Sequence, residues 1–112
     1  MLSGCSGLTI APELPATELA EYCYFSMLEG CTGLTSAPEL PATVLVKDCY
    51  YAMFRNCTGL TSIEVSFGEW IEGTTDDWVL NVDSSGTFIC PSGLEQIFDA
   101  NHIPTGWTVL TK

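Results

Sequence analysis

The chain of 112 residues is built on an internal repeat of twenty-six residues. Residues 1–26 and 27–52 are identical at seventeen positions when overlaid, and a third copy begins at Met53 and departs from the pattern at Ile63. A period of about 20–50 residues is typical of stacked architectures, in which each unit completes the hydrophobic core of its neighbours. The repeat therefore predicts a short solenoid.

Each repeat divides into two halves with different patterns. Residues 31–41 are rich in small residues and proline, which excludes a helix and favours an extended segment, so we predict a short strand over residues 34–37. In residues 42–56 the apolar side chains of Leu45, Cys49 and Met53 recur every four residues, which predicts a helical or 3₁₀ return. Residues 63–67 alternate between apolar and polar and predict a more regular strand.

Residues 68–112 lose the repeat and hold all three tryptophans, Trp70, Trp78 and Trp107. Because large aromatic side chains bury the most area, we predict that this segment is a cap packed on the repeats of residues 1–67. Within the cap we predict strands over residues 87–90 and 107–110. Ser92 and Glu95 have the spacing of a capping box, which predicts a short helix over residues 92–100.

The cysteines follow the repeat. Cys5, Cys31 and Cys57 share one repeat position, and Cys23 and Cys49 share another. Equivalent residues of stacked coils lie about 4.8 Å apart with parallel side chains, which does not suit the torsion angle of a disulfide. We therefore expect buried free thiols. The alternative is a bridge within one unit, between Cys23 and Cys31 or between Cys49 and Cys57.

The charge balance is strongly acidic, with 14 acidic and 3 basic residues and a formal net charge of −11. Contacts to phosphate groups need clustered lysine or arginine, so nucleic acid is not an expected partner. No apolar run approaches the ~18 residues of a membrane span, and no secretory signal segment is visible. We expect no membrane insertion and interpret the acidity as a solvated surface.

The sequence predicts no catalytic chemistry. With His102 as the single histidine, no arrangement of nucleophile and base can be argued, and the cysteine spacing does not fit a zinc site. The acidic residues Glu69, Glu72, Asp76, Asp77 and Asp83 lack the alternating spacing of a calcium loop. We therefore expect no enzyme, no cofactor and no metal.

Two sets of side chains recur in repeat register and are candidates for binding. Glu13 and Glu39 lie on the predicted strand half, and Tyr24, Tyr50 and Tyr51 lie on the return half. An aromatic stripe often serves packing, but protein and glycan interfaces also favour exposed tyrosines. These five residues are the predicted ligand-binding residues, with core packing as the alternative for the tyrosines.

The N-terminal end of the predicted array carries no cap. Residues 1–8 would expose the inner apolar side chains, which predicts self-association through the N-terminal repeat or a natural extension before it. Met1, Met27 and Met53 are in phase, so the chain is also consistent with part of a longer array.

The repeat units resemble a known family. The motifs GCSGLTIAPELPAT, GCTGLTSAPELPAT and NCTGLTS, each after Met-Leu or Met-Phe, are similar to BspA-like leucine-rich repeats of surface proteins from gut anaerobes. DDWVLNVDSSGTFICPSGL and IPTGWTV resemble the segment that often closes those repeats. The resemblance implies an α/β leucine-rich-repeat solenoid, right-handed, with short parallel strands and helical or irregular returns.

The resemblance also implies a function. Members of this family are exported to the bacterial cell surface and adhere to host proteins or glycans. We therefore expect a non-enzymatic binding or adhesion module of a secreted or surface protein. The alternative is a structural spacer or terminal cap of a longer repeat protein, with no ligand of its own.

Overall fold

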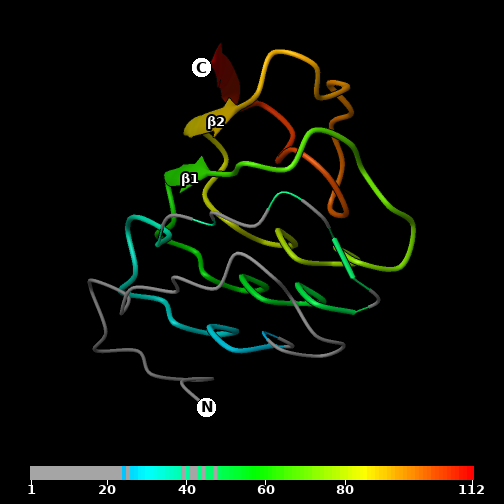
Figure 1. Ribbon diagram of the computed structural model, residues 1–112. Helices are drawn as coiled ribbons and strands as arrows, with labels where there is room; N and C mark the ends of the chain where they lie inside the picture. The colour runs from blue at the N-terminus through cyan, green and yellow to red at the C-terminus, as the bar shows by residue number, and fades with distance from the viewer. Residues whose placement is uncertain (1–23, 25, 39, 41–42, 44, 47) are drawn as a thin grey trace.

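The computed structural model describes residues 24, 26–38, 40, 43, 45–46 and 48–112 (Figure 1). These residues form three short strands and no helix, which gives a small β-type fold. The strands are β1 (Ser62–Glu64), β2 (Thr87–Cys90) and β3 (Thr108–Thr111). The sequence therefore predicted β2 with its correct bounds and β3 to within one residue. Of the strand predicted over residues 63–67, only residues 63 and 64 lie in β1.

The strands form one parallel sheet in the order β1-β2-β3. Ile63 pairs with Phe88, which pairs in turn with Val109, and Ile63 and Phe88 are wholly buried. The strand predicted over residues 34–37 is present only as an isolated bridge from Ser36 to Ser62. Pro38 has no N–H group to donate to a ladder, so pairing with the neighbouring segment is interrupted directly after that bridge.

The return segment predicted to be helical consists instead of consecutive turns. Alternate N–H groups close a turn onto the carbonyl three residues earlier, as Met53 N does with Tyr50 O at 3.1 Å. The N–H groups between them donate to another segment, as Phe54 N does to Trp78 O at 2.9 Å. The helical or 3₁₀ return predicted over residues 42–56 is therefore absent from the described residues of that span, which fit the irregular alternative.

The backbone explains why a helix does not form. Asp48, Ala52 and Asn56 have φ angles of 55°, 51° and 63°, so a left-handed residue ends each turn after four residues. The neighbouring segments repeat this feature at Ser26, Gly30, Gly73, Asp77 and Asn81. Apolar residues four apart fit a chain of four-residue turns as well as one face of a helix, and the sequence pattern alone does not distinguish the two.

The turn segments lie side by side, and backbone hydrogen bonds join each segment to the next one along the chain. Gly30 N donates to Arg55 O at 2.8 Å, and Asn56 N donates to Leu80 O at 2.8 Å. Figure 1 shows these segments as cyan, green and yellow traces one above another. The stacking of hydrogen-bonded turn segments continues past residue 67, where the predicted repeat region ends.

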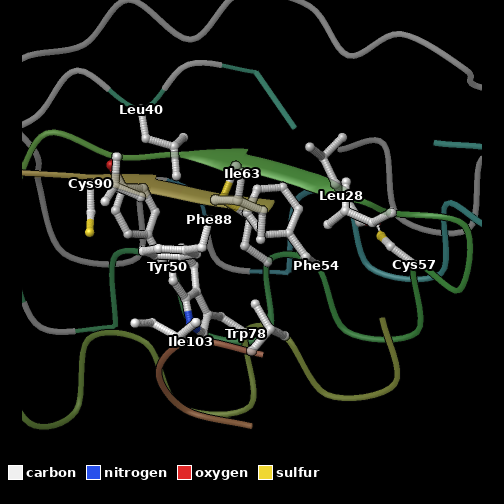
Figure 2. Packing of buried hydrophobic residues seen from close by; sticks show 14 of the residues in the cluster. Leu28, Leu40, Tyr50, Phe54, Cys57, Ile63, Trp78, Phe88, Cys90 and Ile103 are labelled. Carbon is white, nitrogen blue, oxygen red and sulfur yellow. Dashed lines mark hydrogen bonds between the residues drawn. The ribbon is translucent and has the colours of Figure 1, made fainter. Parts of the chain in front are cut away.

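One hydrophobic core lies between the sheet and the turn segments (Figure 2). Stacking of the repeats predicts eight of the described positions as inward. Six of them are buried, namely Leu34, Leu40, Leu45, Met53, Leu60 and Ile63, and the other two, Met27 and Ala37, are partly buried against the same core. The largest fully buried side chains include Trp78, Tyr50, Phe54, Phe67 and Phe88. Aromatic residues from both parts of the chain therefore share one core.

The helix predicted over residues 92–100 is also absent. A turn closes with Leu94 N donating to Pro91 O at 3.1 Å, and Phe98 then pairs with Ile103 in a parallel bridge. The carbonyl of Glu95, which a helix would use internally, accepts the indole N–H of Trp70 at 2.7 Å. Tertiary hydrogen bonding therefore overrides the capping-box pattern.

No helix among the described residues is long and apolar enough to span a bilayer.

Candidate functional site

The predicted tyrosines have different environments. Tyr50 is wholly buried and stacks on Tyr24 at a centroid distance of 5.9 Å and on Trp78 at 5.8 Å. Tyr50 therefore offers no surface to a ligand, and the packing alternative holds for it. Tyr24 and Tyr51 are partly exposed.

Several other predicted positions lie outside the described residues. These are Glu13, Glu39 and residues 1–8, the predicted surface for self-association. The two glutamates and that surface therefore remain predictions from the repeat.

The described cysteines are buried, and Cys57 and Cys90 are free thiols as expected. A Cys49–Cys57 disulfide is therefore excluded. The Cys57 thiol donates to Leu28 O at 2.9 Å, and burial raises the pKa of Cys57 to about 12. Burial also raises the pKa of Cys90. Both thiols stay protonated at neutral pH and are unsuited to act as nucleophiles.

A pocket of about 490 Å³ lies between residues 70–76 and 95–102. Its apolar lining consists of Trp70, Ile71 and Ile97. Its polar lining comprises carboxylates, an amide, a hydroxyl and an imidazole, from Glu72, Asp76, Glu95, Asn101, Thr75 and His102. The volume is in the range of small-ligand sites, but the lining is more polar than the mostly apolar lining of such sites.

Trp70 is held between the core and this pocket. Its indole N–H donates to Glu95 O, and its ring packs edge-on against Phe67 with a centroid distance of 5.2 Å. On another side it meets the imidazole of His102 in a T-shaped contact at 4.9 Å. The partly exposed indole is therefore fixed in place as part of the pocket wall.

Residues 95–102 form the other wall of the pocket and are hydrogen-bonded to residues 75–78. Asn101 Oδ1 accepts from Asp77 N at 2.8 Å, and Asn101 O accepts from the Thr75 hydroxyl at 2.7 Å. The indole N–H of Trp78 donates to His102 O at 2.8 Å. These three hydrogen bonds join the two walls of the pocket.

The charge of the pocket is one-sided. Glu72, Asp76 and Glu95 line it, and its described lining contains no lysine or arginine. Arg55 and Lys112, the basic residues in the described part of the chain, are paired elsewhere. Arg55 Nε donates to Glu29 Oε2 at 2.6 Å, and Lys112 Nζ lies 3.2 Å from Glu64 Oε2.

The Thr75 hydroxyl and the His102 imidazole have separate hydrogen-bond partners in this pocket. His102 Nδ1 lies 2.6 Å from Asp99 Oδ1, which is an orientation that general bases use. However, the Thr75 hydroxyl, the one side-chain hydroxyl in the described lining, is turned to Asn101 O. Within the described residues no group of three or more potential metal ligands is gathered. The arrangement suits binding by charge and hydrogen bonds.

A second pocket, of about 270 Å³, is lined by residues 79–84, 99–100 and 104–105. Its carboxylates already accept hydrogen bonds from the backbone. Asp83 Oδ1 accepts from Ser85 N at 3.1 Å, and Asp99 Oδ1 accepts from Asn101 N at 2.8 Å. This pocket therefore presents less unused polar surface than the one beside Trp70.

The sequence did not identify the pocket beside Trp70. Glu72 and Asp76 were interpreted as surface acids, and Trp70 was assigned to a cap without a site. The available signal was the concentration of tryptophans and acids after residue 68. That signal does not reveal which carbonyls the indole N–H groups would reach.

Comparison of the chain with protein-family models, with curated proteins and with solved structures found no match. The resemblance to BspA-like leucine-rich repeats is thus carried by the sequence motifs alone.

Proposed function

We propose that the chain is a short leucine-rich-repeat solenoid, closed by residues 68–112, that acts as a non-enzymatic binding module. Hydrogen bonds between residues about one repeat apart support the solenoid. Thr61 N donates to Thr35 O at 2.9 Å, and Thr87 N donates to Thr61 O at 2.9 Å, so three successive layers are joined at one position. The repeat motifs add the leucine-rich character of the proposal.

The observation that carries the binding function is the pocket beside Trp70, whose walls are joined by hydrogen bonds. It combines a partly exposed indole with carboxylates whose charge the described basic residues do not neutralise. Indole rings and fixed polar groups are features that recognise protein side chains or sugars. From the repeat resemblance we place the module at a bacterial cell surface or in a secreted protein, with host proteins or glycans as ligands.

One observation favours the alternative, a structural spacer or terminal cap. Tyr50, the tyrosine at the centre of the predicted binding stripe, is stacked inside the core. Tyr50 then stabilises successive layers, and of the three predicted tyrosines only Tyr24 and Tyr51 keep exposed surface. Under this alternative no ligand would use the pocket.

A binding screen with one matched pair of variants tests the proposal. The immobilised chain is screened against host matrix proteins and glycans, and each ligand found is measured again with Ile71→Arg and Leu110→Arg. Ile71 lines the pocket and Leu110 lies on β3, and both are exposed. The arginine at position 71 should occupy the pocket and weaken binding by about tenfold or more, ~1.4 kcal/mol.

The Leu110→Arg variant controls for a general effect of added positive charge, and its affinity should stay close to that of the unchanged chain. Equal weakening by both variants would contradict a role for the pocket. A screen without any ligand would favour the structural alternative.

A further inference from the structure

We propose that the pocket beside Trp70 binds a primary ammonium group on an alkyl chain, the lysine side chain of a partner protein. This inference rests on the proposed binding function and specifies the ligand of the same site. Carboxylates alone would be an ordinary solvated surface. The inference depends on their position around a walled pocket that also has an aromatic and an aliphatic side.

The charge of the pocket selects the sign of the ligand. Glu72, Asp76 and Glu95 surround a space of about 490 Å³, and the described lining offers no lysine or arginine to pair with them. An anionic ligand would be repelled by these side chains and by the net charge of −11 on the whole chain. A cation would be attracted by both.

The hydrogen-bonding groups of the pocket favour a donor ligand. The indole N–H of Trp70 already donates to Glu95 O, and the Thr75 hydroxyl already donates to Asn101 O. The lining also contains the Asn101 side-chain amide and the His102 imidazole, but the three carboxylates, which only accept hydrogen bonds, outnumber them. An ammonium group has three N–H donors and no acceptor, whereas a sugar hydroxyl both donates and accepts. The pocket therefore matches an ammonium group better than a neutral saccharide.

The apolar wall suits the rest of a lysine side chain. Ile71 is 40% exposed, and it lines the pocket with Ile97 and the Trp70 indole. A four-carbon stem can lie along such a surface while its charged end reaches the carboxylates. An ammonium group near an indole face gains a further electrostatic attraction.

Nuclear magnetic resonance titration of the whole chain tests the inference. The reporter is the Trp70 indole N–H, which lies in the pocket wall, and the Trp107 indole N–H, bonded to Asp83 O, is the internal reference. The probe is Nα-acetyl-lysine methylamide, and its matched control is Nα-acetyl-norleucine methylamide, which lacks the ammonium group. We expect a saturable shift of the Trp70 signal with the lysine derivative and about tenfold weaker binding, or none, with the norleucine derivative.

A matched pair of charge-removing variants separates the pocket from the general acidity. Glu72 and Glu69 are both exposed and three residues apart, but only Glu72 lines the pocket. Glu72→Gln should lower the affinity for the lysine derivative by about threefold or more, while Glu69→Gln should leave that affinity nearly unchanged. Equal effects of the two variants would overturn the inference, because attraction would then come from net charge alone.

Two further titrations distinguish a failure of the lysine assignment from a failure of the proposed binding function. Lactose tests a neutral saccharide, and glucosamine tests an ammonium group carried on a sugar. A Trp70 shift with lactose but not with the lysine derivative would overturn the lysine assignment and leave a binding module in place. A preference for glucosamine over the lysine derivative would overturn the protein source of the ammonium group. No shift with any probe, together with an empty binding screen, would overturn both proposals.

Discussion

Replacement of Trp78 with alanine is expected to lower the free energy of unfolding by about 3–5 kcal/mol. The side chain is wholly buried, stacks on the Tyr50 ring and packs at a tilt against the Phe54 ring, with a centroid distance of 5.8 Å in both contacts. Its indole N–H also donates to His102 O, so the substitution removes both a core aromatic and a bond that holds a wall of the pocket. Denaturation with guanidinium chloride, followed by circular dichroism, measures the change.

Phe98→Ala provides the control for this substitution. Phe98 is 43% exposed, so its truncation should change the free energy of unfolding by about 0.5 kcal/mol or less. A loss below about 1 kcal/mol for Trp78→Ala would contradict the single core that joins the repeats to residues 68–112.

Replacement of Gly86 with alanine should lower the free energy of unfolding by about 3 kcal/mol, the upper end of the usual overpacking cost. A Cβ atom at this position would lie 2.5 Å from Thr61 O and 2.7 Å from Trp107 Cε2. The new methyl group would therefore separate β1 from β2, because the obstructing oxygen belongs to the backbone just before β1. Thermal denaturation of the variant checks the loss.

Gly93→Ala is the matched control. A Cβ atom there meets no heavy atom within 4 Å, and alanine at an accommodating glycine position is neutral or stabilises by about 0.4–1 kcal/mol. Equal stability of the Gly86 and Gly93 variants would show that the layers do not approach each other this closely at Gly86.

The sequence predicted β2 and β3 well because their signals are local. Thr87 to Cys90 follows a turn and alternates inward and outward, and the structure places Phe88 and Cys90 in the core. The returns were mistaken for helices because apolar residues every four positions satisfy both a helix and a series of four-residue turns. Ala52 shows the difficulty, since alanine is a strong helix former and here has a φ of 51°.

The candidate site was less predictable than the fold. Its walls come from segments about 25 residues apart in sequence, joined by bonds such as that from Trp70 Nε1 to Glu95 O. Such bonds depend on how the layers stack, which residue types and spacing do not specify. The tyrosine stripe was visible in the repeat, but its register placed Tyr50 toward the core rather than toward solvent.

Stacking of the turn segments underlies both the core and the pocket. Scalar couplings across hydrogen bonds, measured by nuclear magnetic resonance, test this stacking directly. In the labelled protein we expect a scalar coupling from Phe54 N to the carbonyl carbon of Trp78 and another from Tyr50 N to that of Thr74, since these N···O distances are both 2.9 Å. The bond from Thr87 N to Thr61 O serves as a reference in the same spectrum. A coupling from Phe54 N to the carbonyl carbon of Tyr50 would instead show a helix and contradict the stacked turns.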